Sequence, residues 1–176
     1  MNKFFKIVCI LLFLLLGNIS NGNAGLNIFP QPRYIPKLSF YGDSGKSYTV
    51  DNFKSDLLMV MIWSRYCGPC IGDMKHMDSF AQKMKDKGVR VIIISPASEW
   101  KSIDERRTFL KRIGAPNLVS YLDKKANFML GMGVMSTPTV ILINNRSEEV
   151  GQISGSVEWD EPEVIDYILK LKKSLY

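Results

Sequence analysis

The chain is poor in side chains that bind metals. It has one histidine, His76, and three cysteines, of which Cys9 lies in an N-terminal apolar run. A structural zinc ion takes four protein ligands, and outside that run only Cys67, Cys70 and His76 are available. The sequence therefore predicts no metal site. It also lacks the Met-rich or His-rich tract that would favour copper carriage, so a copper chaperone using two thiolates is the least favoured alternative.

The chain also lacks a run of one charge sign and any low-complexity tract. Its net charge is +6, and its 23 basic residues are interspersed with 17 acidic ones. Without the two N-terminal lysines the charge falls to about +4. This distribution argues against nucleic-acid binding and favours at most weak contact with an anionic membrane surface.

No apolar run reaches the length of a membrane-spanning helix. Two lysines precede ten apolar residues, 7–16, and small residues follow at Gly22 and Ala24. This pattern is typical of a secretory signal peptide, so residues 1–24 are predicted to be cleaved after Ala24. A spanning helix needs about twenty residues. An uncleaved N-terminal membrane anchor stays open as the alternative, because other apolar residues flank the run. Either way, the domain is expected to be periplasmic or otherwise extracytoplasmic, and an anchor would add inner-membrane association.

The rest of the chain divides into two parts. Residues 25–37 contain Pro30, Pro32 and Pro36, which predicts a Pro-rich extended linker without regular structure. Residues 38–176 are long enough and apolar enough to form one domain.

Within that domain, strand and helix patterns alternate, which predicts an α/β fold with helices on both faces of a sheet. Continuous apolar runs are expected to form buried strands, and apolar stripes at helical spacing to form helices. Strands are expected over residues 57–63, 89–94, 118–122, 139–143 and 150–153, with a hairpin over 38–50. Helices are expected after Cys70 to Gly88, over 102–114, over 123–132 and from Pro162 onward.

The sequence Cys67-Gly68-Pro69-Cys70 lies between the first buried strand and a helix. The start of a helix favours a thiolate, because unpaired N–H groups and the positive end of the helix dipole lie there. Cys67 is therefore predicted to be the attacking thiolate, and the more buried Cys70 the resolving thiol. A purely structural disulfide is the alternative, but one meant for stability would close a longer loop.

Two motifs together resemble the thioredoxin superfamily. They are Trp63 to Cys70, with its Cys-Gly-Pro-Cys centre, and Thr137-Pro138-Thr139 at the start of an apolar strand. Within the superfamily, the hairpin before the first buried strand and the extra helix and strand between residues 98 and 132 are similar to exported TlpA/ResA/DsbE-like proteins. The resemblance implies a thioredoxin-like fold. Its central mixed sheet would be flanked by helices, with an N-terminal β-hairpin and a central helix-strand insertion.

The resemblance also implies roles for individual residues. Pro138 would be a cis-proline beside the disulfide, and Thr137 would pair through its backbone with a bound substrate. Trp63 and Tyr66 would belong to the substrate-binding surface, with Tyr66 replacing the family's tryptophan before the first cysteine. Arg65 is interpreted as an ordinary surface residue.

One acidic residue is a candidate for proton transfer. The buried aspartate of cytoplasmic thioredoxins is replaced by Met61, so another group must serve as base. Asp73 matches a position where the exported subgroup commonly has a glutamate, and a carboxylate there would accept the proton of Cys70. A solvated acid in the first turns of a helix is the equal alternative. His76 is expected to be exposed and a poor proton shuttle.

The resemblance implies a thiol–disulfide oxidoreductase with no cofactor beyond the Cys67–Cys70 disulfide. The Gly-Pro dipeptide is that of thioredoxin, a reductant, so reduction of client disulfides is favoured over the alternatives of oxidation or isomerisation. The implied partners are client proteins, as in cytochrome c biogenesis or copper-site assembly, and a membrane electron donor of the DsbD/CcdA type.

Overall fold

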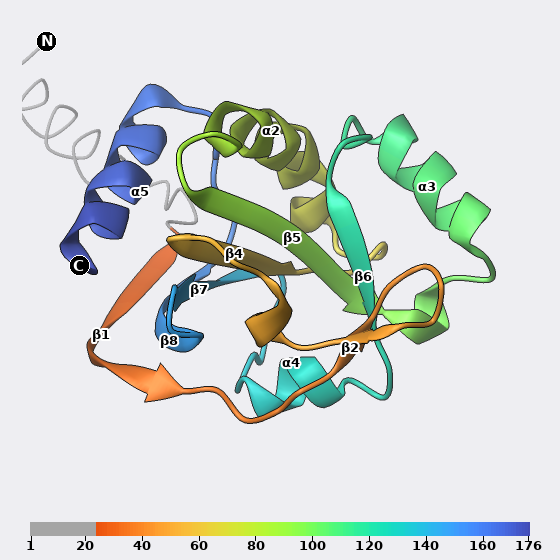
Figure 1. Cartoon of the computed structure of the whole chain (residues 1–176). Helices are drawn as coiled ribbons and strands as arrows, with labels where there is room; N and C mark the ends of the chain where they lie inside the picture. Colours follow the sequence, from red (N-terminus) through yellow and green to blue (C-terminus); the bar gives the residue numbers. More distant parts are fainter. Residues whose placement is uncertain (1–23) are drawn as a thin grey trace, which may run out of the picture.

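A computed structural model describes residues 24–176 as a sheet with helices on both faces (Figure 1). The predicted leader, residues 1–24, lies outside the described residues except for Ala24. In chain order the elements are β1 (Gly25–Tyr34), β2 (Phe40–Tyr41), β3 (Ser47–Tyr48), η1 (Val50–Asn52), β4 (Leu57–Ile62), α2 (Gly68–Met84), β5 (Val89–Pro96), η2 (Ala97–Glu99), α3 (Ile103–Arg112), β6 (Val119–Asp123), α4 (Asn127–Gly131), β7 (Thr139–Asn144), β8 (Glu148–Ser154) and α5 (Pro162–Ser174).

The eight strands form one mixed sheet in the order β1-β8-β7-β4-β5-β6-β2-β3. Strands β4, β5 and β6 are parallel, whereas β7 runs antiparallel to β4 and β8 antiparallel to β7. As a result, the last residue of β4 and the first residue of β7 lie side by side at one end of these strands, where Ile62 pairs with Thr139. The residues that follow β4 and those that precede β7 are thereby brought together.

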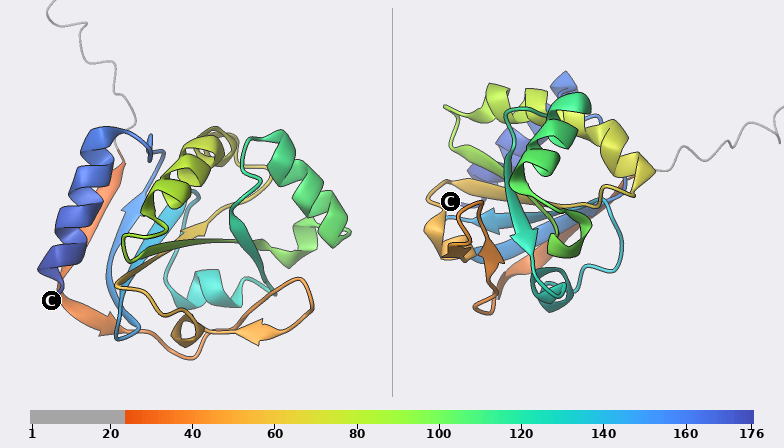
Figure 2. Two further views of the ribbon diagram at one scale, coloured as in Figure 1. Left: turned by 45° about the horizontal axis from the view of Figure 1, so that its top comes forward. Right: turned by 90° about the vertical axis from the view of Figure 1, so that its right-hand side faces the viewer.

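The helices cover the two faces unequally (Figure 2). Helices α2, α3 and α5 pack on one face, and α4 packs on the other with the hairpin and η1. The α2 side chains Met74, Met77, Phe80 and Met84 are fully buried on the first face. This confirms the packing role expected from their helical spacing. The α/β, thioredoxin-like architecture with an N-terminal hairpin, and with α3, β6 and α4 inserted between β5 and β7, is as predicted.

The interpretation of residues 25–37 as a linker is wrong for most of that segment. Residues 25–34 form β1, an edge strand that pairs with β8 from Gly25↔Ser154 to Tyr34↔Glu148. The register shifts between Ile28 and Arg33, the interval that holds both Pro30 and Pro32. Proline cannot donate a ladder hydrogen bond and is tolerated at edge strands and bulges. The prolines therefore interrupt the pairing of this strand without preventing it.

Within residues 24–176, no helix has both the length and the apolar character to cross a bilayer.

Candidate active site

Cys67 and Cys70 form a disulfide at the start of α2, with their Cα atoms 5.2 Å apart. Cys67 is the N-cap residue of this helix, and the Cys70 N–H donates to Cys67 Sγ at 3.2 Å. Pro69 fits the first turn because its missing N–H would have no partner in the helix. The helix start therefore places an N–H donor on the sulfur that is predicted to become the thiolate.

The two sulfurs differ in access to solvent. Cys70 is 0% exposed, whereas Cys67 is partly exposed and is flanked by exposed Tyr66 and Gly68. A client disulfide can reach only a sulfur at the surface. The burial pattern therefore supports Cys67 as the attacking residue and Cys70 as the resolving one.

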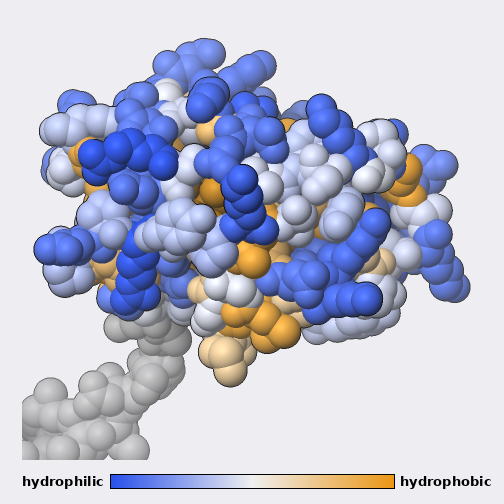
Figure 3. Space-filling view, turned by 60° about the horizontal axis from the view of Figure 1, so that its bottom comes forward, coloured by the Kyte–Doolittle hydropathy of each residue, from blue (hydrophilic) through white to orange (hydrophobic). Residues whose placement is uncertain are grey.

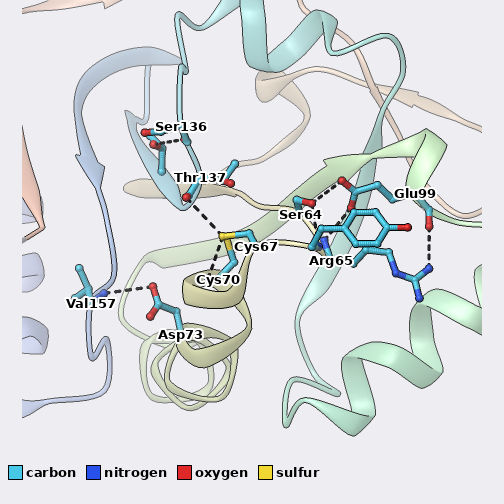
Figure 4. The surroundings of a disulfide bond; sticks show 11 residues. Ser64, Arg65, Cys67, Cys70, Asp73, Glu99, Ser136, Thr137 and Val157 are labelled. Atoms are coloured by element: carbon cyan, nitrogen blue, oxygen red, sulfur yellow. Dashed lines mark hydrogen bonds between the residues drawn. A yellow bond between two sulfur atoms is a disulfide. The ribbon is translucent and has the colours of Figure 1, made fainter. Parts of the chain in front are cut away.

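The segment before β7 lies directly beside the disulfide (Figure 4). The carbonyl oxygen of Thr137 is 3.5 Å from Cys67 Sγ, and the Thr137–Pro138 peptide bond is cis. The cis geometry implied for Pro138 is therefore confirmed. Thr137 is partly exposed, so this segment is accessible to solvent beside the sulfur.

Asp73 follows Cys70 by three residues on α2 and is only 6% exposed. Its Oδ2 accepts a hydrogen bond from the Val157 N–H at 3.3 Å. Burial raises the pKa of this carboxyl, against the opposing effects of hydrogen bonds from Val157 and Ser156 and of the charge of His76. The alternative of a solvated acid is therefore wrong. A buried carboxylate with a raised pKa near a thiol is suited to accept a proton.

Trp63 does not fit its expected place in a substrate-binding surface. Its side chain has no exposed area and packs against Trp100 and Phe109, with ring centroids 5.8 and 6.3 Å away. The residue directly follows β4, so its side chain belongs to the core under α3. Trp63 is thus a core residue beneath the loop that carries Cys67.

The exposed aromatic side chain at the site is Tyr66, at 79%. Met135, which sequence analysis did not single out, is 87% exposed and lies two residues before Thr137. Its only signal in the sequence was its position just ahead of the Thr-Pro-Thr motif. Figure 3, which views the side of α4, shows a mainly hydrophilic surface with a hydrophobic patch at its lower edge.

Arg65 is not the ordinary surface residue that was expected. Its Nη1 donates to Glu105 Oε1 at 2.7 Å and to the Glu99 carbonyl at 2.9 Å, and its guanidinium lies over the Trp100 ring, 4.7 Å from the centroid. Its side chain is 19% exposed. The inserted segment of η2 and α3 thus holds the chain just ahead of Cys67.

Glu99 completes this contact and was also missed by sequence analysis. Its carboxylate accepts from Ser64 Oγ at 2.6 Å and from the Arg65 N–H at 2.8 Å. Glu99 is 35 residues from Ser64 and 34 from Arg65 in sequence, so no local sequence pattern links it to them. Glu99 therefore holds the backbone segment between β4 and α2 that positions Cys67.

His76 is only partly exposed, contrary to expectation. Its Nδ1 lies 2.7 Å from Asp160 Oδ1, and the side chains are 26% and 24% exposed. The residue faces the loop between β8 and α5.

Residues 24–176 contain no cluster of three or more His, Cys, Asp or Glu side chains placed to hold a metal ion.

A mixed sheet with a disulfide at a helix start and a cis-proline beside it defines a thioredoxin-like fold and site. The chain belongs to the Redoxin family, which matches residues 31–169.

Two curated relatives carry related names. The thiol-disulfide oxidoreductase ResA of Halalkalibacterium halodurans is 29% identical over 113 residues, which cover 64% of this chain and 62% of the relative. The thiol:disulfide interchange protein DsbE of Vibrio cholerae is 26% identical over 129 residues, covering 71% of this chain and 66% of the relative. The chain therefore aligns with somewhat under two thirds of the length of the first of them.

A solved structure supports the fold. A thiol:disulfide interchange protein DsbE of Chlorobium tepidum superposes with a TM-score of 0.67 at 21% identity, covering 82% of this chain and 99% of that one. At this identity the likeness speaks for the fold alone.

Proposed function

We propose that the protein is an exported thiol–disulfide oxidoreductase that reduces disulfides of client proteins. The observation that carries the proposal is the disulfide between partly exposed Cys67, at the N-terminus of α2, and fully buried Cys70. Because of this difference in exposure, Cys67 can attack a client disulfide, and Cys70 can then attack Cys67 to release the client.

The reaction begins from the reduced dithiol. The Cys67 thiolate attacks one sulfur of a client disulfide, forms a mixed disulfide and expels the other client sulfur as a thiolate. Cys70 then gives its proton to the Asp73 carboxylate and attacks Cys67 Sγ. The second client thiolate leaves, and two electrons have passed from the chain to the client.

The direction of electron flow rests on the residues between the cysteines. Gly68-Pro69 is the dipeptide of thioredoxin, whose potential is about −270 mV, whereas the oxidant DsbA lies near −120 mV. After each turnover the disulfide of the chain must be reduced again. In an oxidising compartment this requires a dithiol donor, which we assign to a membrane reductase of the DsbD/CcdA type. The favoured clients are proteins of cytochrome c or copper-site assembly, and the location is periplasmic or otherwise extracytoplasmic.

The surface around Cys67 is suited to docking an extended client segment. Tyr66 and Met135 are large exposed side chains on the two segments that flank the sulfur, and the Thr137 carbonyl lies 3.5 Å from it. Exposed apolar and aromatic side chains of this kind are the anchors that carry most binding energy in protein interfaces. We therefore assign client binding to Tyr66, Met135 and the Thr137 backbone, beside Pro138.

Tyr66→Ser and Met135→Ser are each expected to raise KM for reduction of a protein disulfide by about fivefold, since truncating an anchor costs about 1 kcal/mol or more. The rate with a small-molecule disulfide should not change, because Cys67 itself is untouched. Steady-state kinetics with insulin and with a small aromatic disulfide measure both values.

The matched control is Tyr34→Ser. Tyr34 is 81% exposed but lies on β1 opposite Glu148, at the far edge of the sheet from the disulfide. It should leave both reactions unchanged. An unchanged KM for insulin in both site variants would show that clients dock elsewhere, and a chain that reduces neither substrate would refute the proposed activity.

A further inference from the structure

The loop between β8 and α5, residues 155–160, contacts both segments that flank the disulfide. The Gly155 N–H donates to the Pro138 carbonyl at 2.9 Å. Two residues later, the Val157 N–H donates to Asp73 Oδ2 at 3.3 Å, and the neighbouring Ser156 side chain favours the charged form of Asp73, which lowers its pKa. The hydrogen bond to the Asp73 carboxylate therefore comes from this loop, 84 residues further along the chain.

Gly155 allows the chain to make both contacts. Its φ of +93° is a conformation that residues with a side chain rarely adopt. At this point the chain leaves β8, where Ser154 pairs with Thr139, and turns toward α2. The loop is thus fixed at its start by the sheet.

The other end of the loop is fixed by α2. Asp160 accepts a hydrogen bond from His76 Nδ1 at 2.7 Å through its carboxylate and one from Lys83 Nζ at 3.1 Å through its carbonyl. Between these ends, Trp159 is buried and packs against Phe80 with ring centroids 6.1 Å apart. His76 provides the short side-chain contact, whereas Lys83 adds an exposed contact to the backbone.

The charges around this contact are few. From α2, His76, Ser79 and Lys83 face Asp160, and Asp73 lies one turn before His76 on the same helix. Burial raises the pKa of Asp160, but the hydrogen bonds from His76 and Ser79 outweigh burial and lower this pKa below its ordinary value. Asp160 is therefore an ionised acceptor that His76 holds through its Nδ1–H, which both the neutral Nδ1-protonated form and the imidazolium carry.

We propose that His76 is a positioning residue for the exchange reaction: by holding Asp160 it keeps the loop of residues 155–160 where the Val157 N–H donates to Asp73. This inference rests on the proposed function, in which Asp73 accepts the proton of Cys70. His76 itself exchanges no proton with either sulfur. Besides the direct effect of its charge on Asp73, it acts on the carboxylate through the loop.

Loss of the His76–Asp160 contact would change the pKa of Asp73 without changing Asp73 itself. Hydrogen bonds to an ionised carboxylate favour its charged form. If the loop withdraws, Asp73 keeps its burial but loses the donors that offset it, so its pKa rises further. The carboxylate is then protonated, and unable to accept the Cys70 proton, up to a higher pH.

The test is the pH dependence of oxidation of the dithiol by a small disulfide, followed by stopped flow from about pH 5 to about pH 9. His76→Leu and Asp160→Asn should each move the acidic limb of the profile upward by about half a unit or more. His76→Asn keeps a donor near the Nδ1 position and should restore most of the wild-type profile. Lys170→Leu removes an exposed ion pair with Asp166 on α5 and is the control that should not move it.

Three outcomes would overturn the inference. One is an acidic limb that neither variant moves, and another is an equal shift in His76→Asn and His76→Leu, which would assign the effect to charge alone. The third is an equal shift in Lys170→Leu. Failure of the underlying function looks different: the acidic limb of Asp73→Asn would then be the same as that of the wild type. If His76→Leu does not fold, as judged by its thermal transition, Asp160→Asn decides.

Discussion

Cys67→Ser is expected to lower the rate of disulfide reduction by about a thousandfold or more, in line with removal of an attacking nucleophile in other enzymes. A serine hydroxyl does not ionise at neutral pH, so no anionic nucleophile forms at the helix start. The variant should also fail to form any mixed disulfide with a client. Steady-state reduction of insulin measures the loss.

Cys70→Ser is expected to have the opposite signature. The first attack by Cys67 still occurs, but no second thiol is present to resolve the mixed disulfide. Covalent complexes should accumulate and be seen on non-reducing gels, and they should be absent from the Cys67→Ser/Cys70→Ser double variant. Trapping by Cys67→Ser instead would mean that the buried sulfur attacks first, contrary to the observed burial.

Asp73→Asn is expected to slow oxidation of the dithiol by about a hundredfold, since general acid–base catalysis contributes about 10² to 10⁴ in rate. An amide of the same shape cannot accept the Cys70 proton, so the part of the acidic limb that follows protonation of Asp73 should also disappear, and the part that follows protonation of Cys67 should remain. The first attack by Cys67 on a small disulfide should be nearly unchanged. A wild-type rate of oxidation would remove Asp73 from the mechanism.

The same variant should be more stable than the wild type at neutral pH. Because burial raises the pKa of Asp73 above its ordinary value of 3.8, its contribution to stability is fully present below that value. The contribution is lost as the pH rises through the raised pKa. Asparagine carries no charge, so the Tm difference in its favour should shrink on acidification. Asp166→Asn, at an exposed position on α5, should show no such trend.

The parts of the fold that were predicted correctly are those with a strong local pattern. The apolar runs of β4 and β7 are buried on both faces, and helix α2 carries its apolar residues at helical spacing. Strand β1 was missed because its two prolines are typical of irregular chain and because its pairing with β8 spans most of the sequence. An edge strand with one buried side chain, Phe29, has little hydrophobic signal of its own.

The site shows the same division. Cys67, Cys70 and Pro138 lie in short motifs, so their positions could be predicted. The environment of Asp73 depends on Val157, and that of Arg65 on Glu99 and Glu105, all distant in sequence. Trp63 was assigned to the substrate-binding surface on the family resemblance, yet its side chain, directly after β4, lies in the core. Burial and partners of this kind arise only from the folded sheet.

The central claim is that Cys67 and Cys70 form a reducing dithiol couple. Its most direct test is the equilibrium reduction potential of the purified protein, titrated against thiol buffers with alkylation of Cys67 as the readout. The account predicts one two-electron transition near or below about −250 mV. A potential near about −120 mV would contradict it and make the protein a donor of disulfides.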